Sequence, residues 1–305
     1  MTTRPAAPAP LVEGLGFTEG PLWSASGELW VTSISRGLIY AVDGAGRAQV
    51  VAEPGGNPSG LCQDADGTVW IAQGGGHSPT RSTRPVRPGL QRLAGPGLVD
   101  PMGDRAAQGG IAVLDVPTDR VDGPNDCAIG PDGLVWFTDP IGPAMAAEGP
   151  AGRIGSLDPV SGEVRFHAGG IRFPNGMAFT PDGATLYVAE TGTARVLRYR
   201  YTGTSLEPDG VLGALPAGHS DGIALDVEGR VYVAATDADS VQVLDAGGGL
   251  VEAIPFPDGS FPTSVCFGGP DLCTLYVTAA RGGRVWTVPR AVAGAPLHWA
   301  EASTP

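Results

Sequence analysis

Short apolar runs alternate with polar residues along most of the chain, and one arrangement of them occurs six times. Each copy opens on a polar residue, runs through an apolar stretch to a tight turn, often Asp-Gly, and ends in a second apolar stretch with a Trp or Tyr. Asp-Gly between β-rich runs is the strongest short-range signal of a hairpin. We therefore expect six β-hairpins. They cover residues 19–32, 59–72, 125–138, 175–189, 221–234 and 263–278.

Two further short β runs follow most of the hairpins, so each repeat supplies about four strands. The hairpins start 40, 66, 50, 46 and 42 residues apart. Four-stranded units at this period, without amphipathic helices between them, predict an all-β fold, a six-bladed β-propeller with four antiparallel strands per blade. We expect one domain over residues 1–305, with residues 1–10 as a flexible tail. The run near Leu11 to Gly14 is expected to close the ring as the last strand of the sixth blade.

The longest interval between copies contains an insertion at residues 77–108, rich in Pro, Gly and Arg. A loop of this length in a compact domain is usually functional or disordered. Two interpretations stay open at this point, a lid over the channel mouth and a solvated loop. The aromatic residue that ends each hairpin is expected in the core between blades. These residues are Trp30, Trp70, Trp136, Tyr187, Tyr232 and Tyr276.

Composition excludes several classes of function. The chain has a net charge of −13, and all of its basic residues are arginine. Without lysine there is no Schiff-base chemistry, and without a basic run there is little to neutralise nucleic-acid phosphates. No apolar run approaches the ~18 residues of a membrane helix. The four cysteines form no CxxC pair, which favours reduced thiols and a cytoplasmic location. We expect a small-molecule substrate as the partner, with neither nucleic acid nor membrane.

The first residue of each hairpin is expected at one mouth of the central channel, because the first strand of a propeller blade usually lines that channel. We call these six positions the ring positions. All six side chains carry oxygen. They are Glu19, Ser59, Asn125, Asn175, Asp221 and Thr263.

Four ring residues combine two carboxylates with two amide carbonyls, a ligand set that hard divalent cations prefer. Calcium fits best, and magnesium, manganese or zinc stay possible. The chain contains three asparagines in all, and two of them occupy ring positions. A role for asparagine in turns competes with this interpretation. The predicted metal ligands are Glu19, Asn125, Asn175 and Asp221.

Several motifs resemble the senescence marker protein / gluconolactonase / luciferin-regenerating enzyme family over about residues 12–289. They are Glu19-Gly-Pro, Pro124-Asn-Asp, Phe173-Pro-Asn-Gly-Met-Ala-Phe, Ser220-Asp-Gly-Ile-Ala-Leu-Asp and Cys266-Phe-Gly-Gly-Pro-Asp-Leu. The resemblance implies a six-bladed propeller with one catalytic divalent metal, commonly calcium, on the same four ligands. Two features depart from the family. Gly123 stands where many sugar lactonases have an arginine, and Gln73-Gly-Gly-Gly-His77 replaces a loop of the His-Gly-Asn-Arg type.

The chemistry expected from this site is metal-assisted hydrolysis of a cyclic ester, with Asp221 as general base or nucleophile and Asn125 beside it. Asp126 and His219 are alternative bases, and so is His77 if the insertion is a lid. Asp139 and Glu190, at the ends of second strands, have either a supporting role at the site or a purely structural one.

Three other functions stay open on the sequence alone. The same metal site suits phosphotriester hydrolysis, and it suits isomerisation or cyclisation of a specialised metabolite. The third is a non-catalytic propeller that binds a ligand or a protein.

Overall fold

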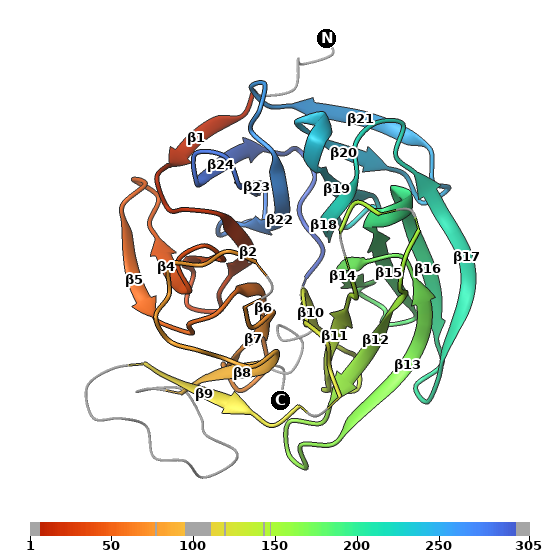
Figure 1. The fold of residues 1–305 in the computed structure, drawn as a ribbon. Helices are drawn as coiled ribbons and strands as arrows, with labels where there is room; N and C mark the ends of the chain where they lie inside the picture. Colours follow the sequence, from red (N-terminus) through yellow and green to blue (C-terminus); the bar gives the residue numbers. More distant parts are fainter. Residues whose placement is uncertain are drawn as a thin grey trace.

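Six four-stranded antiparallel sheets surround a central axis in the computed structural model (Figure 1). The structure describes residues 7–76, 78–94, 111–118, 120–142, 144–146 and 148–296. The predicted six-bladed propeller is confirmed. Each blade runs outward from an inner strand that lines the axis. The strands follow the order of the sequence, except that the outermost strand of the sixth blade is β1.

The first three blades contain the strands of residues 18–171. Blade one comprises β2 (Thr18–Trp23), β3 (Leu29–Ser33), β4 (Leu38–Val42) and β5 (Ala48–Ala52). Blade two comprises β6 (Pro58–Gln63), β7 (Val69–Gln73), β8 (Gly89–Ala94) and β9 (Ala112–Val116). Blade three comprises β10 (Cys127–Ile129), β11 (Val135–Asp139), β12 (Gly152–Leu157) and β13 (Val164–Ile171).

The last three blades contain the strands from residue 174 onward together with the N-terminal strand β1. Blade four comprises β14 (Pro174–Phe179), β15 (Thr185–Glu190), β16 (Arg195–Tyr201) and β17 (Leu206–Ala214). Blade five comprises β18 (Ser220–Leu225), β19 (Val231–Ala235), β20 (Ser240–Leu244) and β21 (Leu250–Pro255). Blade six comprises β22 (Pro262–Gly268), β23 (Thr274–Ala279), β24 (Arg284–Pro289) and β1 (Ala9–Val12).

The N-terminal strand closes the ring, as expected. β1 pairs antiparallel with β24, with Ala9 opposite Thr287. The strand lies two residues nearer the N-terminus than the run from Leu11 to Gly14. Ala9 and Pro10 therefore belong to a sheet, and residues 1–6 of the expected tail lie outside the described residues.

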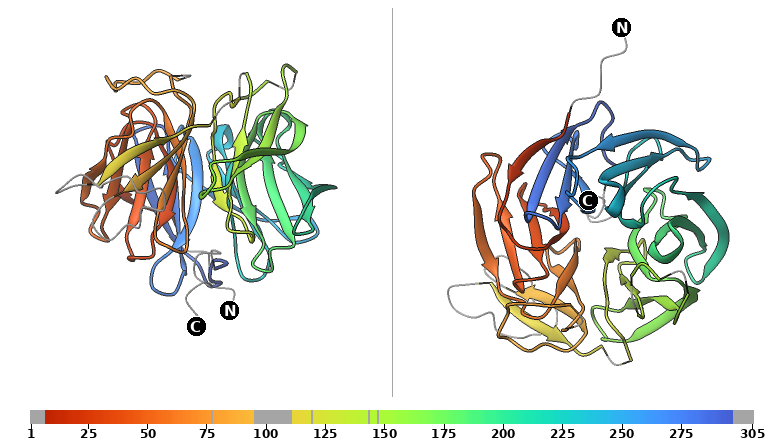
Figure 2. Two further views of the ribbon diagram at one scale, coloured as in Figure 1. Left: turned by 90° about the horizontal axis from the view of Figure 1, so that it is seen from below. Right: turned by 45° about the horizontal axis from the view of Figure 1, so that its top comes forward.

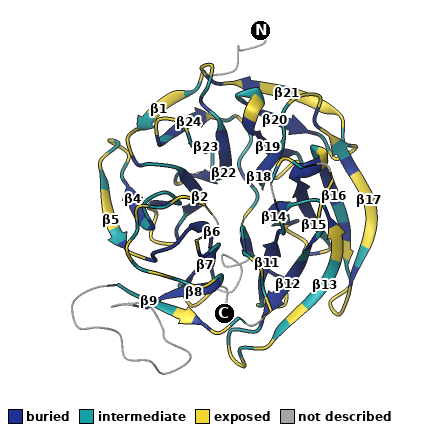
Figure 3. Ribbon diagram, viewed as in Figure 1, coloured by how far each residue is buried: buried dark blue, intermediate teal, exposed yellow. Residues whose placement is uncertain are grey.

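Adjacent blades pack on one another through six hydrophobic clusters, visible as the dark blue inner strands in Figure 3. Each cluster contains one of the six repeated aromatic residues, and Trp70, Trp136 and Tyr232 expose none of their surface. In the cluster between blades two and three, Trp70 and Cys62 of blade two pack with Val135 of blade three. The prediction that these aromatic residues form the core between blades is confirmed.

The interval expected as an insertion holds a strand of blade two. β8 lies inside residues 77–108, because the sheet needs a third strand between β7 and β9. Residues 78–88 cover blades one and two on one face of the propeller (Figure 2, left). There the Arg81 N–H donates to the carbonyl of Ser35, and the Arg84 guanidinium donates to the carbonyls of Glu53 and Pro54. His77 and residues 95–110 lie outside the described residues.

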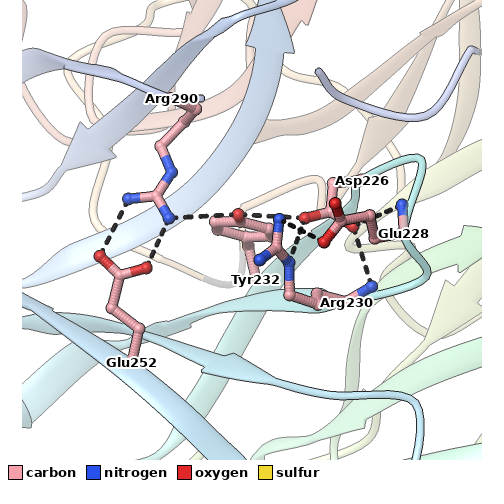
Figure 4. A network of polar contacts seen from close by, with 6 residues as sticks. All are labelled: Asp226, Glu228, Arg230, Tyr232, Glu252 and Arg290. Atoms are coloured by element: carbon pink, nitrogen blue, oxygen red, sulfur yellow. Dashed lines mark hydrogen bonds and ion pairs between the residues drawn. The ribbon is translucent and has the colours of Figure 1, made fainter. Parts of the chain in front are cut away.

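A network of charged side chains joins blades five and six on the opposite face (Figure 4). Arg290 pairs with Glu252 at 2.5 Å and donates to the Tyr232 hydroxyl, which donates to Asp226. Asp226 also accepts from Arg230 at 2.6 Å. The segment after β24 continues across blade five through main-chain bonds, among them Ala295 N–H to the Leu225 carbonyl. This network fixes the C-terminal end of the described chain at the face away from residues 78–88 (Figure 2).

The helical content of the described chain is two single turns, η1 (Thr191–Thr193) and η2 (Thr236–Ala238). No helix in the described ranges has the length and apolarity needed to cross a membrane.

Candidate functional site

The ring residues stand at equivalent points of the inner strands. Glu19 is the second residue of β2, and Asn175 and Asp221 hold the same place in β14 and β18. Asn125 lies two residues before β10, where its N–H donates to the carbonyl of Thr138. Since all inner strands run in the same direction, these residues lie at one end of the channel. This is the face that carries residues 78–88.

Burial separates most of the ring side chains from bulk water, and Asn125 is partly exposed. Glu19, Asn175 and Asp221 expose 8%, 6% and 9% of their surface. The amide of Asn175 donates to Thr191 Oγ1 at 3.1 Å and also hydrogen-bonds the Asp221 carboxylate. Thr191 in turn donates to the carbonyl of Ser220, the residue before Asp221. The neighbouring ring residues of blades four and five are thus held in one hydrogen-bonded chain.

Three carboxylates share this region without a basic partner. Burial, opposed by the Gly20 N–H and reinforced by the charge of Asp126, raises the pKa of Glu19 to about 8. Burial and the charges of Glu19 and Asp126 raise the pKa of Asp221 well above its usual range. Burial raises the pKa of Asp126 to about 6, against the N–H groups of Met177 and Cys127. No ion pair joins these carboxylates to a basic residue within the described ranges.

The donor set fits a hard divalent cation. Buried like charges without a counter-ion are costly, and a cation between them would reverse that cost. Among the described residues no group of three His, Cys, Asp or Glu side chains is arranged as metal ligands. A site here therefore needs the amide oxygens of Asn125 and Asn175 beside the two carboxylates, an oxygen-only set that suits calcium.

The other two ring residues differ in their bonding. Thr263 Oγ1 is bonded to the Thr18 carbonyl at 2.8 Å and to Thr278 Oγ1 at 2.9 Å. Ser59 Oγ is buried and has no hydrogen-bond partner among the described residues. Buried hydroxyls are rarely left unpaired. Ser59 Oγ thus has no hydrogen bond to lose among the described residues, whereas the Thr263 hydroxyl links blades six and one.

We expect opposite stability effects from the two ring hydroxyls. Ser59→Ala removes an unpaired buried hydroxyl, so the variant should be as stable as the wild type or up to about 1 kcal/mol more stable. Thr263→Val leaves partners unpaired and should cost about 1–3 kcal/mol. Urea unfolding measures both, and equal destabilisation by the two substitutions would contradict this assignment.

Side-chain oxygens fix the backbone at the mouth in every blade. Within the four residues before each first strand, an N–H donates to a side-chain oxygen at 2.7–2.8 Å. The acceptors belong to Ser35, Gln73, Asp139, Glu190, Asp237 and Asp239. Asp139 also binds Arg153, and Glu190 also binds Arg195. The structure thus gives Asp139 and Glu190 a role in holding these loops.

The remaining candidate bases differ in position. Asp126 lies beside the quartet and interacts electrostatically with Glu19 and Asp221. His219 Nδ1 lies 3.1 Å from both carboxylate oxygens of Asp237, in a partly exposed loop. His77, the third candidate, lies outside the described residues.

A cavity of about 540 Å³ occupies the other end of the channel. All six inner strands line it, together with the turn at Ser24–Ala25 and the segment at Ala295–Pro296. Asp126 contributes to its wall, and none of the four predicted metal ligands does. Its lining is mostly apolar and includes Cys62, Cys127 and Cys266, which act there as small hydrophobic residues. All four cysteines are free thiols.

Comparison with known proteins assigns the chain to a protein family. The sequence profile described as the SMP-30/gluconolactonase/LRE-like region matches residues 17–281. The chain belongs to this family. That result confirms the family resemblance and agrees with the propeller found in the structure.

Several relatives share parts or most of the chain. A pentonolactonase of Haloferax volcanii is 36% identical over 162 residues, which cover 52% of this chain and 53% of that protein. The diisopropyl-fluorophosphatase of Loligo vulgaris is 25% identical over 90% of each chain. The crystal structure of regucalcin, a calcium-binding protein of Agrobacterium tumefaciens, has a TM-score of 0.74 at 26% identity and covers 96% of this chain and 98% of its own.

Proposed function

We propose that the protein is a divalent-metal-dependent lactonase whose metal ligands are Glu19, Asn125, Asn175 and Asp221. The observation that carries the proposal is the pair of buried carboxylates, Glu19 and Asp221, at one channel mouth without a basic partner among the described residues. Lactonases among the relatives, including the pentonolactonase, support the reaction class. The calcium-binding regucalcin supports calcium as the ion.

The reaction adds one water molecule to a cyclic ester. The oxygen of water bonds to the carbonyl carbon, the bond from that carbon to the ring oxygen breaks, and the ring oxygen takes up a proton. A bound divalent cation supplies Lewis acidity toward the carbonyl oxygen. The product is the open-chain hydroxy acid.

The chain's own residues supply the base and its orientation. Asp221 would take the proton from the attacking water, and the amide of Asn175 hydrogen-bonds its carboxylate. The chain from Asn175 through Thr191 to the Ser220 carbonyl fixes both residues in place. Asp126, held by the N–H groups of Cys127 and Met177, adds negative charge beside them. This charge strengthens the attraction for a cation.

Phosphotriester hydrolysis is the second candidate. It is favoured by the likeness to diisopropyl-fluorophosphatase, which covers 90% of each chain. The same four residues would hold the metal in that case. A phosphotriester in the substrate panel separates the two reactions.

A lactone panel with and without chelator tests the proposal. We expect hydrolysis of at least one lactone, loss of that activity on treatment with EGTA or EDTA, and recovery on addition of calcium. Faster turnover of a phosphotriester than of every lactone would favour the second candidate. Activity that survives removal of all divalent metal would overturn the metal dependence.

We also propose a cytoplasmic location and a small-molecule substrate. The four free thiols support a reducing compartment. Relatives that are lactonases, among them a pentonolactonase and a gluconolactonase, support a small-molecule substrate.

A further inference from the structure

The residue two positions before each ring residue stands at the rim of the proposed mouth. We call these six residues the rim residues. They are Phe17, Asn57, Gly123, Phe173, His219 and Phe261. Rim residues of different blades occupy equivalent positions. In several blades, the residue that follows the rim residue and precedes the ring residue pairs with the last residue of the second strand. Examples are Pro58 with Gln73, Pro174 with Glu190 and Pro262 with Ala279.

The polar rim residues, Asn57 and His219, use several of their hydrogen-bonding groups within the protein. Asn57 donates to the Ile34 carbonyl and accepts from the Ser78 N–H. His219 Nδ1 is bonded to Asp237, and Gly123 has no side chain. A polyhydroxy substrate needs donors and acceptors that are free to meet its hydroxyls. This rim offers few of them.

The three phenylalanines of the rim are set apart from the other five in the chain. Phe137, Phe166, Phe179, Phe256 and Phe267 all pack in the clusters between blades. Phe17, Phe173 and Phe261 belong to none of the six clusters and are partly exposed. Their rings therefore do not serve the core of the fold.

Two of these phenylalanines hold a strained backbone. Phe173 and Phe261 both have φ of +57°, a region in which a bulky residue is a genuine outlier. Most other positive-φ positions of the described chain are glycine, which adopts this conformation without strain. Such strain is typical of ligand-binding sites, where the surrounding structure enforces it. Two hydrogen bonds hold the backbone of Phe261 in this conformation. Its N–H donates to Asp239, and its carbonyl accepts from the Ala280 N–H.

The arrangement of the blades spreads these three residues around the mouth. Phe261 and Phe17 come from the adjacent blades six and one, whose inner strands β22 and β2 contact each other. Phe173 comes from blade four, on the far side of the channel from blade one (Figure 1). The Arg281 guanidinium lies 5.8 Å from the centre of the Phe261 ring, within cation–π range.

We propose that the substrate of this site is a lactone with an apolar substituent, aryl or alkyl, that the rings of Phe17, Phe173 and Phe261 bind at the rim. The inference rests on the proposed lactonase function and adds the substrate class to it. Water still opens the ester between the carbonyl carbon and the ring oxygen, and the apolar group stays on the hydroxy-acid product. Aromatic rings with few free polar groups bind apolar groups well and polyhydroxy chains poorly.

The test compares three lactones of the same ring size on calcium-loaded protein. They are unsubstituted δ-valerolactone, a δ-lactone with a phenyl substituent, and glucono-δ-lactone. We expect kcat/KM of the wild type to be at least about tenfold higher for the phenyl-substituted lactone than for glucono-δ-lactone. Phe173→Ala and Phe261→Ala should each lower kcat/KM for the phenyl-substituted lactone about tenfold and change that for δ-valerolactone less than about threefold.

Phe166→Ala is the matched control, because Phe166 packs against Phe137 and under Arg153 in the core between blades. It should lower stability and leave the ratio of the two lactones unchanged. The wild-type comparison stands even if a rim variant fails to fold. Wild-type preference for glucono-δ-lactone, or an unchanged ratio in folded rim variants, would overturn the apolar substrate class alone. Hydrolysis of none of the lactones by metal-loaded protein would overturn the lactonase function and this inference with it.

Discussion

Asp221→Asn is expected to lower kcat/KM for lactone hydrolysis by about a thousandfold or more. General base catalysis contributes about 10²–10⁴-fold, and the same substitution removes one of two anionic metal ligands. Asparagine has the size of aspartate, so the hydrogen bond to Asn175 and the packing of β18 can persist. Steady-state kinetics at saturating calcium separates lost chemistry from lost metal.

The same substitution should stabilise the protein when metal is removed. Asp221 is buried beside Glu19 and Asp126, and like charges in a buried site oppose folding. We expect the Tm of chelator-treated Asp221→Asn to exceed that of chelator-treated wild type, with a shift of about 2–4 °C for each kcal/mol gained. In saturating calcium the order should reverse, since ligand binding stabilises the wild type more.

Asp237→Asn is the matched control for Asp221→Asn. Asp237 lies at the same face but binds the N–H and ring of His219. Its substitution should retain most of the activity and should not raise the Tm of the metal-free protein. If Asp221→Asn kept wild-type kcat/KM in saturating calcium, Asp221 would be neither the base nor a required ligand.

Trp136→Ala is expected to cost about 3–5 kcal/mol in the free energy of unfolding, the usual range for truncating a fully buried large aromatic residue. The Trp136 side chain exposes no surface and fills the space between blades three and four. It stacks on His167 at 4.3 Å between ring centres and meets Phe179 edge to face. Its Nε1 donates to Asp132 at 3.0 Å, so truncation also leaves a carboxylate without this partner.

Trp23 provides the comparison for Trp136. It is partly exposed, stacks on Tyr276 and lines the cavity at the far end of the channel. Trp23→Ala should therefore cost less than half as much as Trp136→Ala in urea unfolding monitored by circular dichroism. Equal losses would show that the repeated aromatic position is not the main support of the contact between blades.

The repeat of six hairpins was sufficient to predict the blades, the closing N-terminal strand and the common position of the ring residues. It worked because a propeller applies one local rule six times, with an apolar first strand, a tight turn and an aromatic residue in the second strand. β8 was missed because the long interval hid it inside residues 77–108. The third strand of a blade carries no turn signal comparable to Asp-Gly.

Other features of the mouth could not be predicted from the residues alone. The acceptors that fix the mouth loops are as different as Ser35, Gln73 and Asp239, so no residue type marks their common role. The positive φ of Phe173 and Phe261 runs against the preference for glycine that sequence rules use. The raised pKa of Glu19 depends on burial beside Asp126, which only the closed ring of blades creates.

Calcium titration of chelator-treated protein by isothermal titration calorimetry tests the central claim most directly. We predict one calcium ion per chain for the wild type. Glu19→Gln and Asn175→Ala should each weaken binding by at least about tenfold, because Glu19→Gln removes a negative charge from the proposed site and Asn175→Ala removes a ligand oxygen. Asp237→Asn should bind as the wild type does. No binding by the wild type, or unchanged affinity in both Glu19→Gln and Asn175→Ala, would contradict a metal site on the four ring residues.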